Sequence, residues 1–200
     1  MKKIIAILSG LLILSWISTV VSADQIEQGI VAGLDAYKEK EYNKAIRSLE
    51  AAAQEIREMK ASRIKGIFPE PLPGWSADEA ESIAIGSIFA GGAISGSRIY
   101  SQGDSTIKID IVSDSPFISI VTSMISNPVM AQISPLMKII NIKGRDAVSE
   151  WNNAQQSGNI KVVASEKVLV TVSGENCRKE DIFAYADVID YRKIDELTSS

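Results

Sequence analysis

The feature that most constrains this chain is a run of short apolar segments between residues 94 and 175, separated by tight turn signals. Residues 106–111 (TIKIDI) alternate polar and apolar side chains strictly, which is typical of a strand with one buried face. Residues 168–172 (VLVTV) are rich in β-branched side chains. Further strands are expected at 94–100, 138–142, 147–151 and 160–164. Turns such as residues 101–104 (SQGD) leave no room for crossover helices, so the sheet should be antiparallel.

Helical segments are expected around these strands. Ser76, with Glu79 three residues later, has the form of a capping box and predicts a helix over residues 76–90. The other helical stretches are expected over residues 116–136, with a break near Asn127-Pro128, and around Ile182, Tyr185, Ala186 and Ile189. We therefore predict an α+β sandwich domain over residues 76–200, in which an antiparallel β-sheet packs with helices.

Residues 24–65 predict an N-terminal helical hairpin ahead of this domain. They contain no proline, and apolar side chains recur at steps of three and four on either side of a charged turn at residues 38–41. The hairpin resembles a single tetratricopeptide repeat in its small, aromatic and bulky positions, which are Gly33, Tyr42, Ala45, Leu49 and Ala52. A solenoid needs several repeats, so we expect the hairpin to pack on its own domain or on a second copy. Docking of a foreign helix is the alternative.

Residues 66–75 form a proline-rich linker between the hairpin and the main domain. Three prolines stand at every second position, namely Pro69, Pro71 and Pro73. Because proline disfavours helix at the residue before it, the linker should be extended and fairly stiff. We expect Phe68 and Trp75 to tuck into the core. The alternative is that the segment binds a proline-recognition module.

The first 23 residues have the order of a secretory signal peptide. Lys2 and Lys3 form a cationic start, residues 4–21 carry no charge, and Val21-Ser22-Ala23 places small residues at a cleavage site. Cleavage after Ala23 predicts a periplasmic or secreted protein without membrane contact in its mature form. An uncleaved anchor is the alternative, because about 20 apolar residues span a bilayer.

The composition excludes several kinds of chemistry. The chain has no histidine and one cysteine, Cys177, so it has no imidazole base, catalytic triad, His-ligated zinc or internal disulfide. Arg178, the next residue, is of a type that can lower the pKa of a neighbouring thiol, yet a redox role is not favoured without a histidine or a second cysteine. The net charge of −4 disfavours a nucleic-acid partner. We predict no catalytic residue, cofactor or metal ligand, and a protein that is not an enzyme.

Short motifs in the main domain carry a resemblance. Pro73-Gly74-Trp75, Ser97-Arg98-x-Tyr100, Asp114-Ser115-Pro116 and Asn127-Pro128 look like a set found in uncharacterised exported bacterial proteins. The later part, from Gly144-x-x-Ala147 to the terminal helix, is similar to the DcrB-like periplasmic proteins. That group shares an α/β/α sandwich with the extrinsic photosystem subunits. The resemblance implies this fold and a non-enzymatic envelope or accessory role, and it transfers no catalytic residue.

Two functional hypotheses follow. The first is an exported, non-catalytic envelope or periplasmic protein that acts through protein–protein contacts, with an unknown protein partner or as a homodimer through the hairpin. The second is a carrier or binder of a small apolar ligand between sheet and helices. The uncharged residues 115–137 carry Met124, Met130 and Met137, flexible side chains that suit core packing or an adaptable apolar ligand or partner surface. Asn127-Pro128 argues against membrane contact by this stretch.

Overall fold

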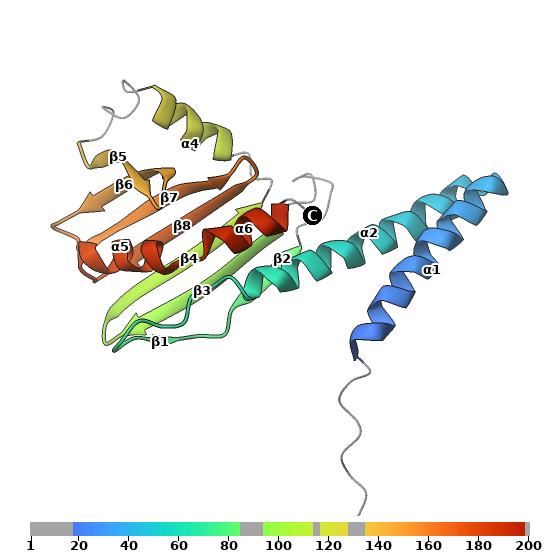
Figure 1. Cartoon of the computed structure of the whole chain (residues 1–200), viewed down its shortest axis with the longest axis horizontal. Helices are drawn as coiled ribbons and strands as arrows, with labels where there is room; N and C mark the ends of the chain where they lie inside the picture. The colour runs from blue at the N-terminus through green and yellow to red at the C-terminus, as the bar shows by residue number, and fades with distance from the viewer. Residues whose placement is uncertain (1–17, 85–93, 114–116, 128–134, 199–200) are drawn as a thin grey trace, which may run out of the picture. The chain divides into compact units, whose positions relative to one another are not determined.

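The chain divides into two compact units between Ile56 and Arg57 in the computed structural model, which describes residues 18–84, 94–113, 117–127 and 135–198. The first unit contains most of a helical hairpin, and the second contains an antiparallel sheet with packed helices (Figure 1). The predicted α+β fold with an N-terminal hairpin is therefore confirmed. The boundary expected at residue 65 lies inside the second unit.

The hairpin consists of α1 (Ser18–Lys38) and α2 (Tyr42–Lys65), joined at the charged stretch that the sequence indicated. Lys40 turns the chain with a positive φ of 65°, and the Glu41 amide donates to the Ala36 carbonyl at 2.9 Å. The two helices approach closely at small residues. A Cβ atom on Gly33 would lie 2.7 Å from Leu49 Cγ, so a larger residue there would force the Leu49 side chain to move.

The part of the second unit that the structure describes contains an eight-stranded, fully antiparallel sheet in the order β1-β3-β4-β8-β7-β6-β5, with β2 also paired to β3. Its strands are β1 (Ser76–Ala77), β2 (Glu81–Ala84), β3 (Ile94–Gln102), β4 (Ser105–Ser113), β5 (Met137–Ile142), β6 (Arg145–Asn152), β7 (Ser157–Ser165) and β8 (Val168–Glu175). The last six coincide with the six strands expected from the sequence.

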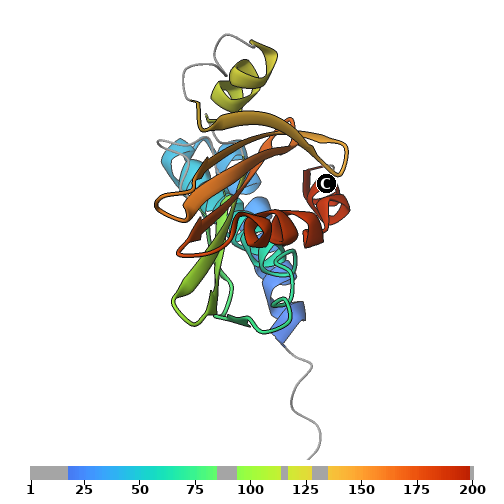
Figure 2. The same cartoon turned by 90° about the vertical axis from the view of Figure 1, so that its left-hand side faces the viewer.

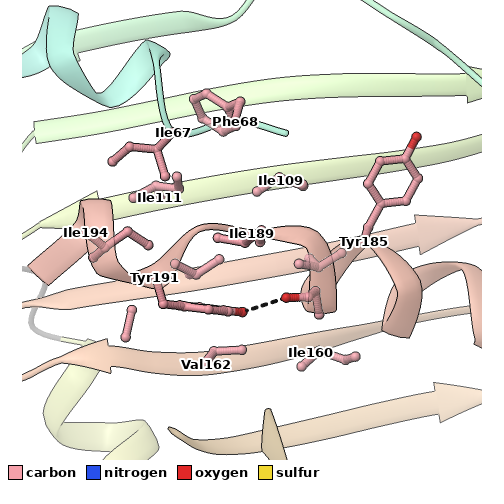
Figure 3. Packing of buried hydrophobic residues seen from close by; sticks show 14 of the residues in the cluster. Ile67, Phe68, Ile109, Ile111, Ile160, Val162, Tyr185, Ile189, Tyr191 and Ile194 are labelled. Carbon is pink, nitrogen blue, oxygen red and sulfur yellow. Dashed lines mark hydrogen bonds between the residues drawn. The ribbon is translucent and has the colours of Figure 1, made fainter. Parts of the chain in front are cut away.

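One face of the sheet carries the main core. The inward positions of the strands are Ile and Val residues that are almost fully buried, including Ile109, Ile111, Ile160 and Val162 (Figure 3). They pack under α5 (Lys179–Val188) and α6 (Tyr191–Thr198). The expected inward stripe of Ile182, Tyr185, Ala186 and Ile189 is fully buried, which confirms it. The terminal helix is, however, two helices, and the Tyr191 hydroxyl donates to the Ala186 carbonyl at 3.0 Å across their junction.

The proline-rich segment belongs to this core. Phe68 is buried and Trp75 packs against the core cluster with its ring 5.4 Å from that of Tyr185, as predicted. The Tyr100 hydroxyl and Arg98 Nη1 donate to the Pro69 carbonyl at 2.8 and 3.0 Å. The segment is thus fixed by hydrogen bonds and by packing.

The prediction of a helix that starts at Ser76 is wrong over the residues that the structure describes. Residues 76–77 and 81–84 are strands paired to β3, and residues 85–90 lie outside the described chain. Between the strands, the Asp78 amide donates to the Ile99 carbonyl at 3.0 Å, and Arg98 Nε donates to the Asp78 carbonyl at 3.0 Å. An N-cap stabilises a helix by only about 1 kcal/mol, whereas an open sheet edge offers a row of backbone partners.

Candidate binding groove

Helix α4 (Phe117–Ser126) lies on the other face of the sheet, opposite α5 and α6 (Figures 1 and 2). It carries no charge, and it ends just before the break expected at Asn127-Pro128. Ile118 and Val121 point at the sheet and are buried, while Phe117 and Ile120 are 62% and 48% exposed. Only one side of the helix is therefore used for packing on the sheet.

The face of the sheet beneath α4 is built from the outward positions of its strands. Register places Val112 beside Leu169, and Val148 opposite Lys161. Val148 and Leu169 are buried with Ile118 and Val121 in a second, smaller apolar cluster. This cluster attaches α4 to the sheet.

A groove of about 440 Å³ lies between α4 and the sheet next to this cluster. Its lining is mostly apolar, with a few polar side chains from the strands, and comprises Val112, Phe117, Ile120, Val121, Met124, Met137, Val148, Glu150, Asn159, Lys161, Leu169 and Thr171. Its volume lies within the range of small-molecule sites, which are likewise mostly apolar with a few polar groups.

The polar residues of the groove are neighbours on the sheet. Lys161 pairs with Thr171 across β7 and β8, and Asn159 pairs with Glu150 across β7 and β6. Lys161 Nζ donates to Asn159 Oδ1 at 2.7 Å, which holds the ammonium near the floor. An ammonium has three N–H donors, and this bond accounts for one of them. The floor therefore presents cationic, hydroxyl and carboxylate groups beside apolar walls.

A second hollow of about 710 Å³ lies along the other side of α4. Its lining is more polar and comprises Ile118, Ser119, Thr122, Ser123, Val163, Glu166 and Lys167. The Ser123 hydroxyl donates to the Ser119 carbonyl at 2.7 Å, so this hydroxyl serves the helix itself. The first groove, with its apolar walls, is the better candidate site.

Two of the three methionines singled out from the sequence line the groove. Met124 comes from α4 and Met137 from β5, and both also pack against the small apolar cluster. Met130 lies outside the described residues. Sequence reasoning missed the sheet residues of the groove, such as Lys161 and Thr171. Strand alternation in 157–165 and 168–175 contained the signal, because it assigns these side chains to the face away from the core.

The environment of Cys177 differs from the one expected. The cysteine is buried, and burial, reinforced by the Asp181 carboxylate, raises the pKa of its thiol to about 11. The lowering of this pKa that Arg178 could bring about is therefore not found. Arg178 is hydrogen-bonded to Asp181, with Nη2 2.6 Å from Oδ1, so its charge is paired there. The same hydrogen bond holds the pKa of the Asp181 carboxyl below its ordinary value.

Within the described chain, no three or more Cys, Asp or Glu side chains are grouped so as to hold a metal ion. Among the described helices, none has the length and apolar character needed to span a membrane. What the groove offers is an apolar surface with hydrogen-bonding groups on its floor, an arrangement suited to holding a molecule.

No protein-family model, curated protein or solved structure matches this chain. The resemblance to the DcrB-like proteins and to a tetratricopeptide repeat therefore stays a prediction.

Proposed function

We propose that the chain is an exported, non-catalytic binding protein whose groove beneath α4 takes a small apolar ligand with one polar group. The observation that carries the proposal is the groove itself, about 440 Å³ in volume, with Met124 and Met137 on its lining. Methionine side chains adapt their shape to irregular apolar partners. This is the second of the two hypotheses drawn from the sequence, and the groove favours it.

The floor of the groove suggests which part of a ligand is polar. Lys161 and Thr171 supply donors, and Glu150 supplies an acceptor. A ligand with a hydroxyl or carboxyl group at one end would place that group on the strands and its apolar part against α4. Burial of the apolar part provides most of the affinity, at about 25 cal/mol per Å².

Methyl NMR tests this proposal at the level of single residues. The chain has five methionines, so labelled methyl groups give separate reporters. Titration with 1-octanol and with octanoate should shift the Met124 and Met137 signals and leave Met59, on α2, unchanged. A stronger response to octanoate would assign the polar end to Lys161. Shifts confined to Met59, or no shifts at all, would contradict a ligand site in the groove.

Export is the other part of the proposal, and the order of features in residues 1–23 supports it. The intact mass of the protein recovered outside the cytoplasm tests it, with a mature start at Asp24 as the expected result. A chain that retains Met1 would favour the anchor instead.

A second candidate function, contact with other proteins in the envelope, is favoured by a different observation. The hairpin exposes large apolar side chains, among them Leu34 and Ile46, which are 49% and 53% exposed. Exposed apolar surfaces of this kind mark interaction sites, whether for another protein or for a second copy of the chain.

A further inference from the structure

The hairpin part of the first unit buries only small side chains. Its buried apolar residues among those described are Ala36, Ala45 and Ala52. On α2, Ala52 lies against Gly29 of α1 and the backbone of Ala45 lies against Gly33, so the two helices approach closely there. The large apolar residues of the same segment are 42–62% exposed, and they are Ile30, Val31, Leu34, Tyr37, Tyr42, Ile46, Leu49 and Ile56. A two-helix layer with so small a core requires further burial to be stable.

Seven of these large residues lie on one face of the hairpin, whereas Val31 lies on the side of α1 that points away from α2. On α1, Ile30, Leu34 and Tyr37 follow steps of three and four, about a quarter turn from the glycines that face α2. On α2, Tyr42, Ile46 and Leu49 are displaced in the same rotational sense from Ala45 and Ala52. In antiparallel helices, equal displacements bring both stripes to the same side, where the Tyr37 and Tyr42 rings are 6.1 Å apart. We call the seven residues the apolar face.

The size of this face fits a dimer. A large apolar side chain presents about 200 Å² when fully exposed, so seven half-exposed ones present roughly 600–700 Å². A standard interface buries about 800 Å² on each partner, rim included. A second apolar face of the same size would therefore cover it and leave only polar rims.

Charge along the hairpin is arranged in a self-complementary way. The half next to the turn, residues 35–47, has four basic and three acidic residues, a net charge of +1. The half away from the turn, residues 24–34 with 48–56, has four acidic residues (Asp24, Glu27, Glu50 and Glu55) and no basic one, a net charge of −4. If two hairpins pack with their turns at opposite ends, the acidic half of each lies against the weakly basic half of the other, which is favourable. If they pack with their turns at the same end, the two acidic halves lie against each other and repel.

We infer that the apolar face binds a second copy of this chain, with the two hairpins antiparallel about a two-fold axis. The face is centred near residue 32 of α1 and residue 49 of α2, at the level where Gly33 meets Leu49. The two-fold axis then places α1 over α1 of the second copy. Ile30 of each copy lies against Leu34 of the other. The product is a four-helix bundle of two layers, whose core is made by both chains.

Sedimentation equilibrium of the full chain at about 100 μM tests the association, because specific dimers of this size bind in the micromolar range or tighter. The expected species is a dimer. Leu34→Glu places a charge in the centre of the apolar face and should weaken the dimer at least about tenfold. Ala32→Glu adds the same charge to an exposed position on the other side of α1, and it should leave the dimer intact.

Disulfide trapping tests the orientation. A mixture of the Glu27→Cys and Lys38→Cys variants should form a cross-linked dimer, because these positions face each other across the antiparallel pair. Neither variant alone should cross-link. The native Cys177 is buried and stays out of the reaction.

A monomer at this concentration, or a dimer that Leu34→Glu leaves unchanged, would overturn the inference. The second result would assign association to another surface, such as the uncharged residues 4–21. Cross-linking by each variant alone, with none between the two, would overturn the antiparallel arrangement. None of these results bears on the α4 groove, so the two proposals fail separately.

Discussion

A Cβ atom on Gly96 of β3 would lie 2.5 Å from Cγ2 of Ile64 on α2, so only a glycine lets the end of this helix rest on the sheet. The ring of Phe68 adjoins the same position, with Cε2 at 3.2 Å. Ala61 and Ile64 are buried in the main core. The last turns of α2 are therefore part of the sheet's core.

Truncation tests this relationship. We expect residues 57–200 to unfold in one cooperative transition, because they form a compact unit with its own core. Residues 66–200 lack Ala61 and Ile64 and should be less stable by about 2–4 kcal/mol, the contribution of the apolar area lost. Urea denaturation of both fragments measures the difference. Equal stabilities would show that the helix end is dispensable.

Gly96→Ala supplies the matching control. In residues 57–200 the added methyl group collides with Ile64, and we expect a loss of about 1–3 kcal/mol. In residues 66–200 that collision is absent, so the same substitution should cost clearly less. An equal cost in both fragments would place the strain elsewhere.

The attachment of α4 gives a second prediction. Leu169 is buried beneath α4 with Val148, so Leu169→Ala should lower the free energy of unfolding by about 2–4 kcal/mol. Ile120 is on α4 itself but 48% exposed, and Ile120→Ala should cost less than about 1 kcal/mol. Urea denaturation monitored by circular dichroism compares them. A larger loss for Ile120→Ala would mean that α4 packs through its other side.

Cys177 gives a prediction on pH. With a pKa of about 11 in the folded chain, about one thiol in a thousand is ionised at pH 8, against roughly a quarter at an unfolded pKa near 8.5. A thiol reagent such as DTNB should therefore react only as fast as the chain unfolds. Because the folded pKa is raised, the buried thiol stabilises the fold fully below about pH 8.5, and this contribution is lost as the pH rises towards 11.

The matched control for this measurement is the same chain in denaturant. DTNB should react there at the rate of an ordinary exposed thiol. Equally fast reaction of the folded chain at pH 8 would contradict both the burial of Cys177 and its raised pKa.

Local sequence patterns were sufficient to predict most strands of the sheet. The alternation in residues 106–111 and the β-branched run in 168–172 report on the burial of one face, and burial of that face decides strand formation. The helix predicted from Ser76 and Glu79 was wrong because a capping signal is local, whereas the strand that forms there depends on contacts far along the chain. The hydrogen bond from the Asp78 amide to the Ile99 carbonyl is one of them. Pairing of a short segment with the edge of a sheet is not indicated by the local sequence pattern.

The groove was predictable only in part for a related reason. Met124 and Met137 stand out by residue type in an uncharged stretch. Lys161 and Glu150 are brought to the same face by the register of β6 and β7, which pairs Glu150 with Asn159 and Lys161 with Val148, and a shift of one residue would send them to opposite faces. Register depends on the whole sheet, so a sequence pattern does not fix which polar groups the floor carries.

Native mass spectrometry after incubation with a bacterial lipid extract tests the central claim, ligand binding under α4, most directly. We expect one small molecule per chain. Thr171→Phe fills the groove from β8 and should abolish the adduct. Ser97, on β3, lies on the same face of the sheet as Thr171 but outside the groove, so Ser97→Phe should retain the adduct. An unmodified chain without any adduct, or an adduct that persists in Thr171→Phe, would contradict the account.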